Sequence, residues 1–285
     1  MRILITGAQG QLGTALQPTL TGHDLVLKDL PAFDLTDPSC ETQIVEACPD
    51  VIIHAGAYTN VDGAEREPER ARAVNVQGTV RVARAAGRLN CRLLYISTDY
   101  VFDGTKSAPY LEDDTANPIN AYGQSKWDGE VAVLQSGVNA LVVRTAWLYG
   151  HEGANFVKTI LRFAAEKPYL DVVADQRGCP TFARDLAEAI RDLLAVDLRG
   201  ICHITNGGDC TWHEFAEAIV QLAGLPTEVR PITTQQAGRL ARRPAYSVLG
   251  QDRLRSVRAP LPHWRNALGR FVKQVSVAAS VGGTS

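Results

Sequence analysis

A tyrosine and a lysine separated by three residues are the side chains best suited to chemistry in this sequence. Tyr122 and Lys126 stand in the segment Tyr-Gly-Gln-Ser-Lys. On a helix, residues four apart lie on one face, so the phenol and the ammonium would point into the same space. A free tyrosine titrates near about pH 10, and an adjacent ammonium is expected to lower the pKa of the phenol toward the range that acid–base catalysis needs. The spacing predicts a proton donor, Tyr122, tuned by Lys126.

A hydroxyl group ends an apolar run upstream of this pair. Residues 93–97 read Leu-Leu-Tyr-Ile-Ser, and Thr98 follows them. At the carboxyl end of a central parallel strand, Thr98 would lie across from Tyr122 and hydrogen-bond a substrate carbonyl oxygen. We therefore predict Thr98, Tyr122 and Lys126 as the catalytic residues of an enzyme.

A glycine-rich turn near the N-terminus indicates the cofactor. An apolar segment runs directly into Gly7-Ala-Gln-Gly10-Gln-Leu-Gly13. Gly7 permits a sharp turn, Gly10 lets backbone N–H groups approach a pyrophosphate, and Gly13 lets helix and strand pack closely. The following helix N-terminus adds unpaired N–H donors and partial positive charge. The sequence predicts a bound NADPH or NADH, contacted here by Gly7, Gly10, Gln11, Leu12 and Gly13.

The ends of the next two predicted strands supply further cofactor contacts. Asp29 would accept a hydrogen bond from a ribose 2′-hydroxyl and favour NADH, whereas Lys28 would attract a 2′-phosphate and favour NADPH. Both residues are present, so the cofactor preference stays open. Small residues after the third strand leave room for a ligand in the crevice. We expect contacts from Ala55, Ala57, Tyr58 and Thr59, and from Tyr122 and Lys126, the lysine also holding the nicotinamide ribose.

The elements that must position these residues alternate along the first half of the chain. Short apolar runs at residues 2–6, 24–28, 51–54, 93–97 and 140–144 predict buried strands, and residues 11–20, 38–48, 68–90 and 122–136 predict helices. This alternation predicts an α/β fold, a doubly wound parallel Rossmann-type sheet over residues 1–150.

The second half of the chain has a less regular pattern. Residues 155–166 and 182–195 predict helices, residues 169–173 a short strand, and Thr211 with Glu214 a capping box that opens a further helix. We expect loops and short elements over residues 226–262, and fraying over residues 277–285. Residues 151–285 are therefore expected to form mainly a smaller substrate-binding lobe, with segments that return to the first domain.

Composition excludes several classes of protein. The chain has 285 residues, of which 45% are hydrophobic and 21% charged, and its net charge of -2 gives no general attraction to nucleic acid or an anionic membrane. It has no apolar run of the roughly 20 residues that a membrane helix needs. Six cysteines and six histidines show no metal-ligand spacing, and no charged-then-apolar segment precedes the first strand. We expect a cytoplasmic protein that needs no metal, with free thiols.

Longer motifs carry a specific resemblance. The segments Thr98-Asp-Tyr-Val-Phe-Asp-Gly, Tyr122-Gly-Gln-Ser-Lys, Arg144-Thr-Ala-Trp-Leu-Tyr-Gly and Asp175-Gln-Arg-Gly-Cys-Pro-Thr together resemble the dTDP-4-dehydrorhamnose reductases, a family of the extended short-chain dehydrogenase/reductase superfamily. The glycine spacing G-x-x-G-x-x-G resembles that superfamily too. Arg242-Arg-Pro-Ala-Tyr-Ser adds to the match, which covers residues 2–271.

The resemblance implies a reaction and a substrate site. It implies NAD(P)H-dependent reduction of the 4-keto group of dTDP-4-dehydro-L-rhamnose to dTDP-L-rhamnose, a precursor of cell-surface polysaccharide. It implies substrate contacts from Val61, Thr98, Tyr100, Tyr122, Trp147 and Arg242, and adenine contacts from Asp34 and Leu35. It also implies a possible homodimer. The chain departs from the family where Ser247 is followed by Val-Leu-Gly, which leaves details of the substrate loop open.

Two other functions stay open. An epimerase or 4,6-dehydratase would share the fold, but dehydratases carry Asp-Glu after the threonine, whereas Asp99-Tyr100 follows Thr98 here. A non-catalytic dinucleotide-binding subunit, like the regulatory subunit of methionine adenosyltransferase, would share the motifs without the activity.

Overall fold

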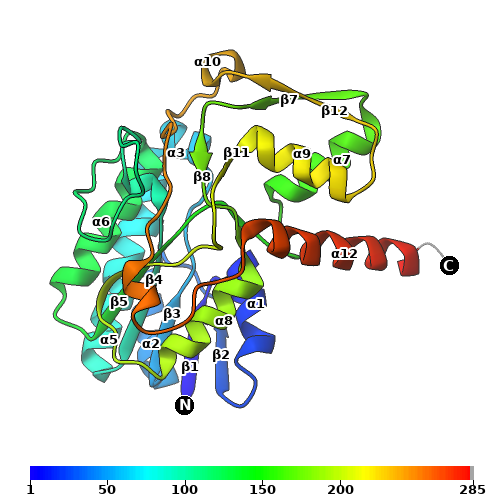
Figure 1. The fold of residues 1–285 in the computed structure, drawn as a ribbon. Helices are drawn as coiled ribbons and strands as arrows, with labels where there is room; N and C mark the ends of the chain where they lie inside the picture. The colour runs from blue at the N-terminus through cyan, green and yellow to red at the C-terminus, as the bar shows by residue number, and fades with distance from the viewer. Residues whose placement is uncertain (283–285) are drawn as a thin grey trace.

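A six-stranded parallel sheet forms the centre of the protein (Figure 1). In this computed structural model the backbone of residues 1–282 and the side chains of residues 1–275 are described. The strand order is β10-β5-β4-β3-β1-β2. The strands are β1 (Arg2–Thr6), β2 (Asp24–Lys28), β3 (Val51–His54), β4 (Arg92–Thr98), β5 (Ala140–Thr145) and β10 (Gly200–His203). Five were predicted within a residue or so at each end, and β10 was not predicted.

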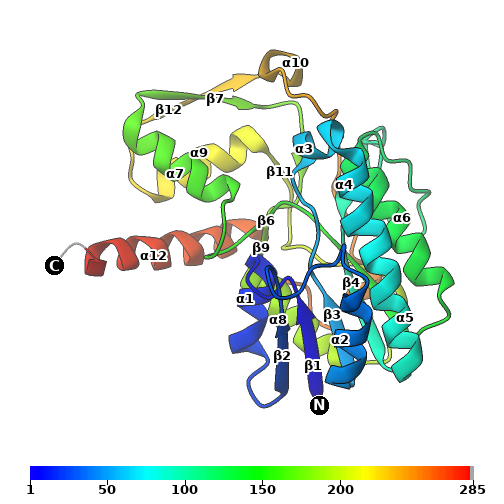
Figure 2. The same cartoon turned by 180° about the vertical axis from the view of Figure 1, so that it is seen from behind.

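Helices cover both faces of this sheet, as Figures 1 and 2 show from opposite sides. On one face α1 (Gln11–Thr19) packs against α8 (Ala183–Leu194); on the other, α5 (Thr79–Leu89) packs against α2 (Ser39–Ala47) and α6 (Ala121–Gln135). Each face buries its own apolar cluster, because strands covered on both sides need hydrophobic residues at every position. The predicted doubly wound α/β fold is confirmed.

The strand order reverses between β1 and β3, and the glycine turn lies at that point. Open α/β sheets bind ligands at such a reversal, outside the carboxyl ends of the strands. Gly7 has a φ of +66°, and a Cβ on it would lie 2.7 Å from the backbone of Gly56. A Cβ on Gly13 would lie 2.1 Å from the Gly7 carbonyl oxygen. Both glycines are therefore required by close backbone approach.

The helix predicted over residues 68–90 contains a wider turn. It consists of α4 (Pro68–Arg72), a π-helical segment η1 (Ala73–Gly78) and α5. Asn75 stands in η1, where its Oδ1 accepts from the Tyr58 backbone N–H at 2.8 Å and its Nδ2 donates to Ser125 Oγ at 2.9 Å. These tertiary contacts accompany the wide turn, and side-chain periodicity does not predict it. The short helix α3 (Val61–Arg66), capped by Asn60, was also not predicted.

A smaller lobe packs beside the carboxyl end of the sheet (Figure 1). It contains α7 (Phe156–Glu166), α9 (Trp212–Leu222) and the parallel pair β7 (Tyr169–Val173) with β12 (Glu228–Ile232), around an aromatic core. The predicted capping box is present, with the Thr211 side chain accepting from the Glu214 N–H. The lobe also includes α12 (Trp264–Gly282), which projects from the body of the protein.

Short elements complete the chain. These are η2 (Asp99–Val101), β6 (Leu148–Tyr149), β8 (Arg177–Gly178), β9 (Thr181–Phe182), β11 (Cys210–Thr211), α10 (Thr234–Ala237) and α11 (Asp252–Arg255). The fraying predicted for residues 277–285 lies outside the described side chains, and residues 283–285 lie outside the described backbone. Over the part of the chain that is described, no helix has the length and apolarity to cross a membrane.

Candidate active site

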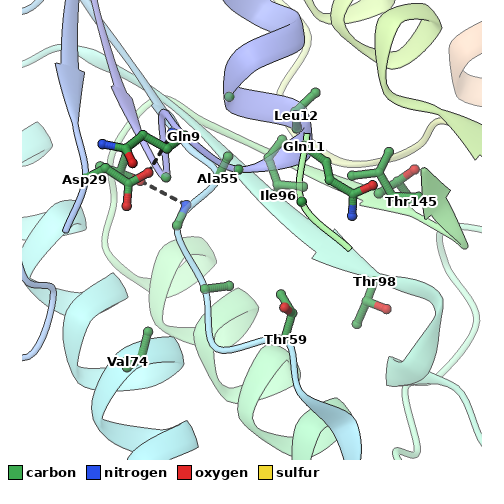
Figure 3. Close-up of a pocket in the computed structure, with 18 of the residues that line it drawn as sticks. Gln9, Gln11, Leu12, Asp29, Ala55, Thr59, Val74, Ile96, Thr98 and Thr145 are labelled. Atoms are coloured by element: carbon green, nitrogen blue, oxygen red, sulfur yellow. Dashed lines mark hydrogen bonds between the residues drawn. The ribbon is translucent and has the colours of Figure 1, made fainter. Parts of the chain in front are cut away.

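A cavity of about 760 Å³ opens at the carboxyl ends of β1 to β5 (Figure 3). We call it the sheet-end cavity. It is lined by most of the residues predicted to bind the cofactor: Gly7, Gly10, Gln11, Leu12, Gly13, Asp29, Asp34, Leu35, Ala55, Ala57, Thr59, Tyr122 and Lys126. Thr98 and Trp147 line it as well. Residues far apart in the sequence thus meet at the strand ends.

Two predicted cofactor residues lie outside the lining of this cavity. Lys28 donates from Nζ to Gln43 Oε1 at 3.3 Å, beside the Phe33 ring. The Tyr58 hydroxyl donates to Glu67 at 3.3 Å, while its backbone is paired with Asn75. Of the two residues that left the cofactor preference open, only Asp29 faces the cavity.

Several polar groups in the sheet-end cavity suit a dinucleotide. Asp29 stands at its rim beside Gln9 (Figure 3). Its carboxylate accepts from the backbone N–H groups of Gln9 at 2.7 Å and Leu30 at 2.8 Å. Gln11 Oε1 and Thr145 Oγ1 are buried without a hydrogen-bond partner among the described residues. A buried polar atom without a partner is costly, so a ligand group is the expected partner. The lining fits a nicotinamide dinucleotide.

The three predicted catalytic residues are brought together by the packing of α6 against the end of β4. Asn120 caps α6 and accepts from the Gly123 N–H at 2.7 Å. A Cβ on Gly123 would lie 2.1 Å from the Tyr100 carbonyl oxygen, so the first turn of α6 touches the backbone just after Thr98. This close approach places the Tyr122 phenol beside the Thr98 side chain at the wall of the sheet-end cavity.

Lys126 follows one turn later and is buried. Its Nζ donates to the Ile96 carbonyl oxygen at 2.7 Å and lies 4.1 Å from the centre of the Tyr95 ring. Burial lowers the pKa of Lys126 to about 7, and the nearby carboxylate of Glu130 opposes that shift. The ammonium is therefore held at the cavity wall by a backbone carbonyl and an aromatic face.

The pKa of Tyr122 moves in the direction opposite to the prediction. Lys126 was expected to lower the pKa of the phenol. Instead burial raises the pKa, because the phenol is withdrawn from water although part of the residue faces the cavity. A phenol with a raised pKa keeps its proton at neutral pH, which suits a group that donates a proton.

A second cavity, of about 1200 Å³, lies between the large domain and the smaller lobe. We call it the lobe cavity. Tyr100, Arg239 and Arg243 line it, and both arginines face Asp62, at 3.8 Å and 3.1 Å respectively. Of the predicted substrate residues, Arg242 and Val61 line neither cavity: Arg242 is exposed, and its carbonyl accepts from Asn120.

Two aromatic pairs form the wall shared by the cavities. Tyr122 of the sheet-end cavity meets Tyr100 of the lobe cavity edge to face, with ring centroids 5.8 Å apart. Trp147 stacks on Trp212, with ring centroids 3.5 Å apart. Trp147 has a φ of +45°, a strained backbone for a bulky residue. The contacts around Trp147, including its stacking on Trp212, must therefore outweigh this strain.

A buried ion pair lies behind the catalytic residues. Glu130 and Arg144 are 2.7 Å apart, and their side chains are 0% and 1% exposed. Glu130 also accepts from Ser97 Oγ at 2.5 Å. The sequence did not predict this pair, because α6 and β5 carry its two members and only the fold brings them together.

Sequence reasoning missed further lining residues of the sheet-end cavity: Phe33, Val74, Ile96, Thr145 and Asn155. Thr145 had a usable signal, because it ends the fifth strand as Thr98 ends the fourth, and the two residues are paired in register. Asn155 also had one, as the first residue of a predicted helix; in the structure it is the N-cap of α7. Phe33 and Val74 had none beyond ordinary apolar patterning.

Comparisons with known proteins agree with this geometry. A family model described as the RmlD substrate binding domain matches residues 1–277. The dTDP-4-dehydrorhamnose reductase of Mycolicibacterium smegmatis is 42% identical over 100% of this chain and 87% of its own. A probable dTDP-4,6-dihydroxy-2-methyloxan-3-one 4-ketoreductase of Streptomyces antibioticus is 43% identical over 94% of this chain and 93% of its own.

A solved structure extends the comparison to the fold. The dTDP-4-dehydrorhamnose reductase of Bacillus anthracis, in complex with NADP, superposes with a TM-score of 0.93 at 42% identity, over 96% of this chain and 99% of that one. Sequence, fold and cavity point the same way: this chain belongs to the dTDP-4-dehydrorhamnose reductase family.

Proposed function

We propose that this chain reduces the 4-keto group of dTDP-4-dehydro-L-rhamnose to the hydroxyl of dTDP-L-rhamnose, with NADPH or NADH as reductant. The observation that carries the proposal is the position of Thr98, Tyr122 and Lys126 in one cavity with the glycine turn. Family membership and the NADP complex of the Bacillus anthracis relative support it.

The side chains have complementary roles in this proposal. When bound, the nicotinamide cofactor supplies the hydride that reduces the sugar C4 and leaves oxidised. Tyr122 gives its proton to the oxygen of the same carbonyl, so the C=O double bond becomes CH–OH and the charges balance. Lys126 stabilises the phenolate that remains and binds the nicotinamide ribose. The raised pKa of Tyr122 supports a donor that loses its proton only as the alkoxide forms.

The lobe cavity suits the nucleotide part of the substrate. Arg239 and Arg243 supply positive charge there for a diphosphate. Trp147 and Tyr100 stand on the wall between the cavities, where an aromatic face suits a deoxyhexose ring. We assign this substrate contact to Arg243 rather than to Arg242, because Arg243 lines the cavity, whereas Arg242 is exposed and lines neither cavity.

A spectrophotometric assay at about 340 nm, the absorption of a reduced nicotinamide, tests the proposal. Purified protein with dTDP-4-dehydro-L-rhamnose should oxidise NADPH or NADH in proportion to the dTDP-L-rhamnose formed. If neither cofactor is oxidised although both bind, the protein is a dinucleotide-binding subunit rather than a reductase. If one equivalent of NAD stays bound to the protein after dialysis and no net oxidation of NADPH or NADH occurs, the protein is an epimerase or a dehydratase.

A related keto sugar is a second candidate substrate. The Streptomyces antibioticus relative, 43% identical, is named a probable 4-ketoreductase of a different dTDP-linked sugar. The same assay with both sugars separates the candidates by kcat/KM. A preference of more than about tenfold for dTDP-4-dehydro-L-rhamnose supports the first.

We also propose where the enzyme is located and how it assembles. The reaction draws on the cytoplasmic pool of nicotinamide cofactor, so we place the enzyme in the cytoplasm, without nucleic acid or membrane partners. We also propose a homodimer. Light scattering of the purified protein would give about twice the chain mass of 30.9 kDa if the dimer forms, and the chain mass itself if it does not.

A further inference from the structure

A carboxylate next to the catalytic threonine is not used by the mechanism above. Asp99 is only 2% exposed and lines neither cavity. A buried carboxylate needs hydrogen-bond donors, because leaving water is costly. Its Oδ1 accepts from Thr98 Oγ1 at 3.0 Å, and its Oδ2 accepts from Ser247 Oγ at 2.6 Å. One hydroxyl from the adjacent residue and one from a distant part of the sequence thus satisfy one carboxylate.

This arrangement fixes the only proton of the Thr98 hydroxyl. Because Thr98 donates to Asp99, its oxygen is left to accept, and it accepts from the Tyr100 backbone N–H at 3.2 Å. The Tyr122 phenol, which lies beside this oxygen, can therefore donate to it but cannot accept from it. The direction of the phenol O–H therefore depends on Asp99. In the sequence-based prediction Thr98 bound the substrate carbonyl directly.

Ser247 belongs to a segment that also reaches the lobe cavity. Its backbone N–H donates to the Arg177 carbonyl at 2.8 Å, which ties the segment to the smaller lobe. Four residues earlier, Arg243 lines the lobe cavity and pairs with Asp62. One short stretch of chain therefore contacts both the proposed nucleotide site and the carboxylate beside Thr98.

We propose that Asp99 is a positioning residue for the reduction. It accepts the Thr98 hydroxyl proton and so fixes the orientation of the Tyr122 phenol, while Ser247 fixes Asp99 by a hydrogen bond. This inference rests on the proposed reductase function. The charge state agrees with it: burial raises the pKa of Asp99 to about 6, and the hydrogen bonds from Ser247 and Thr98 limit that rise, so the group is ionised at neutral pH. The titratable groups that face Asp99 are the phenols of Tyr100 and Tyr122 and the thiol of Cys179.

Ser247→Ala is the decisive variant, with Thr205→Val as its matched control. Thr205 is also fully buried, and its hydroxyl accepts from Gln251 at 2.8 Å, away from both cavities. We expect Ser247→Ala to lower kcat roughly 10- to 100-fold, with KM and the Kd for NADPH within about twofold of wild type. The variant would lose the orientation of the Tyr122 phenol but not the binding of substrate or cofactor. The deuterium isotope effect on kcat should rise as the chemical step becomes limiting, and Ser247→Thr should restore turnover.

A second readout needs no substrate and separates this inference from the proposed reaction. The infrared carbonyl band of protonated Asp99, identified by its absence in Asp99→Asn, is followed against pH. Its midpoint should rise in Ser247→Ala, because a donor to the ionised form is lost, and should stay unchanged in Thr205→Val. An unchanged midpoint in Ser247→Ala overturns the inference, whether or not the wild type reduces the sugar. Turnover in Ser247→Ala equal to that of Thr205→Val also overturns it.

Discussion

The buried pair of Glu130 and Arg144 gives a prediction in which the stability and the activity of the enzyme change together. The perturbation is Glu130→Gln, which keeps the shape of the side chain and removes its charge. In the native protein Glu130 accepts from Arg144 Nη2 at 2.7 Å and from Arg144 Nε at 3.0 Å and 3.1 Å. Both side chains are almost completely buried, so no water replaces the lost charge.

The expected loss of stability follows from this burial. Removing one partner of a buried ion pair leaves an uncompensated charge and costs about 3–5 kcal/mol. For a chain of this size each kcal/mol shifts the melting temperature by about 2–4 °C. We therefore expect Glu130→Gln to melt roughly 6–20 °C below the wild type.

The same change alters the charge of Lys126. Burial lowers the pKa of Lys126 to about 7 and Glu130 opposes that shift, so the variant should have a Lys126 pKa below about 7. Above that pKa the ammonium, and with it support for the Tyr122 phenolate, is lost. The decline of kcat/KM at rising pH should therefore begin at lower pH in the variant.

Differential scanning calorimetry and pH–rate profiles test both effects. Glu112→Gln is the control, because Glu112 is buried but, among the described residues, accepts a single hydrogen bond, from the His203 backbone N–H at 3.1 Å. The double variant Glu130→Gln with Arg144→Met should recover much of the stability, since no unpaired charge stays buried. A Glu130→Gln melting temperature equal to that of Glu112→Gln, with an unchanged pH profile, would refute the reasoning.

Three further predictions concern the sheet-end cavity. Lys126→Met should abolish turnover, yet at pH 7 it should be more stable than the wild type by about 4 kcal/mol. The pKa of Lys126 is about 7 in the folded protein and 10.5 in the unfolded chain, so the wild type loses stability as the pH falls from 10.5 to 7. Chemical unfolding should show that the difference in unfolding free energy between the two proteins shrinks toward pH 10. Gly13→Ala should raise the Kd for NADPH more than about tenfold by calorimetry, because its Cβ would meet the Gly7 carbonyl at 2.1 Å, whereas Gly269→Ala, with open space, should leave it unchanged. Thr145→Val should leave the apo melting temperature unchanged or higher and shrink the rise on adding NADPH; an unaltered rise would mean that the unpaired hydroxyl does not meet the cofactor.

The sheet and the glycine turn were predictable because local physics determines them. Runs of Val, Ile and Leu bounded by polar residues define β1, β2 and β3 at the bounds that the structure gives. Close backbone approach at Gly7 and Gly13 follows from the motif alone. By contrast, β10 was missed because Gly-Ile-Cys-His is short and acquires strand structure only by pairing with β5.

The site was predictable as a set of residues but not in its electrostatics. Tyr122, Lys126 and Thr98 were placed at strand and helix ends by spacing alone. The raised pKa of Tyr122 was not predicted, because burial depends on tertiary packing that spacing does not give. Ser247 and Asp99 are 148 residues apart in the sequence, and no local sequence pattern predicts their contact.

Tyr122→Phe tests the central claim most directly, because it removes one oxygen from the cluster at the sheet-end cavity and little else. NADPH affinity, measured by fluorescence titration, should stay within about threefold of the wild type, while kcat for the dTDP-linked keto sugar should fall by at least about 100-fold. A variant that binds NADPH normally and turns over at near the wild-type rate would contradict the assignment of Tyr122 as the proton donor.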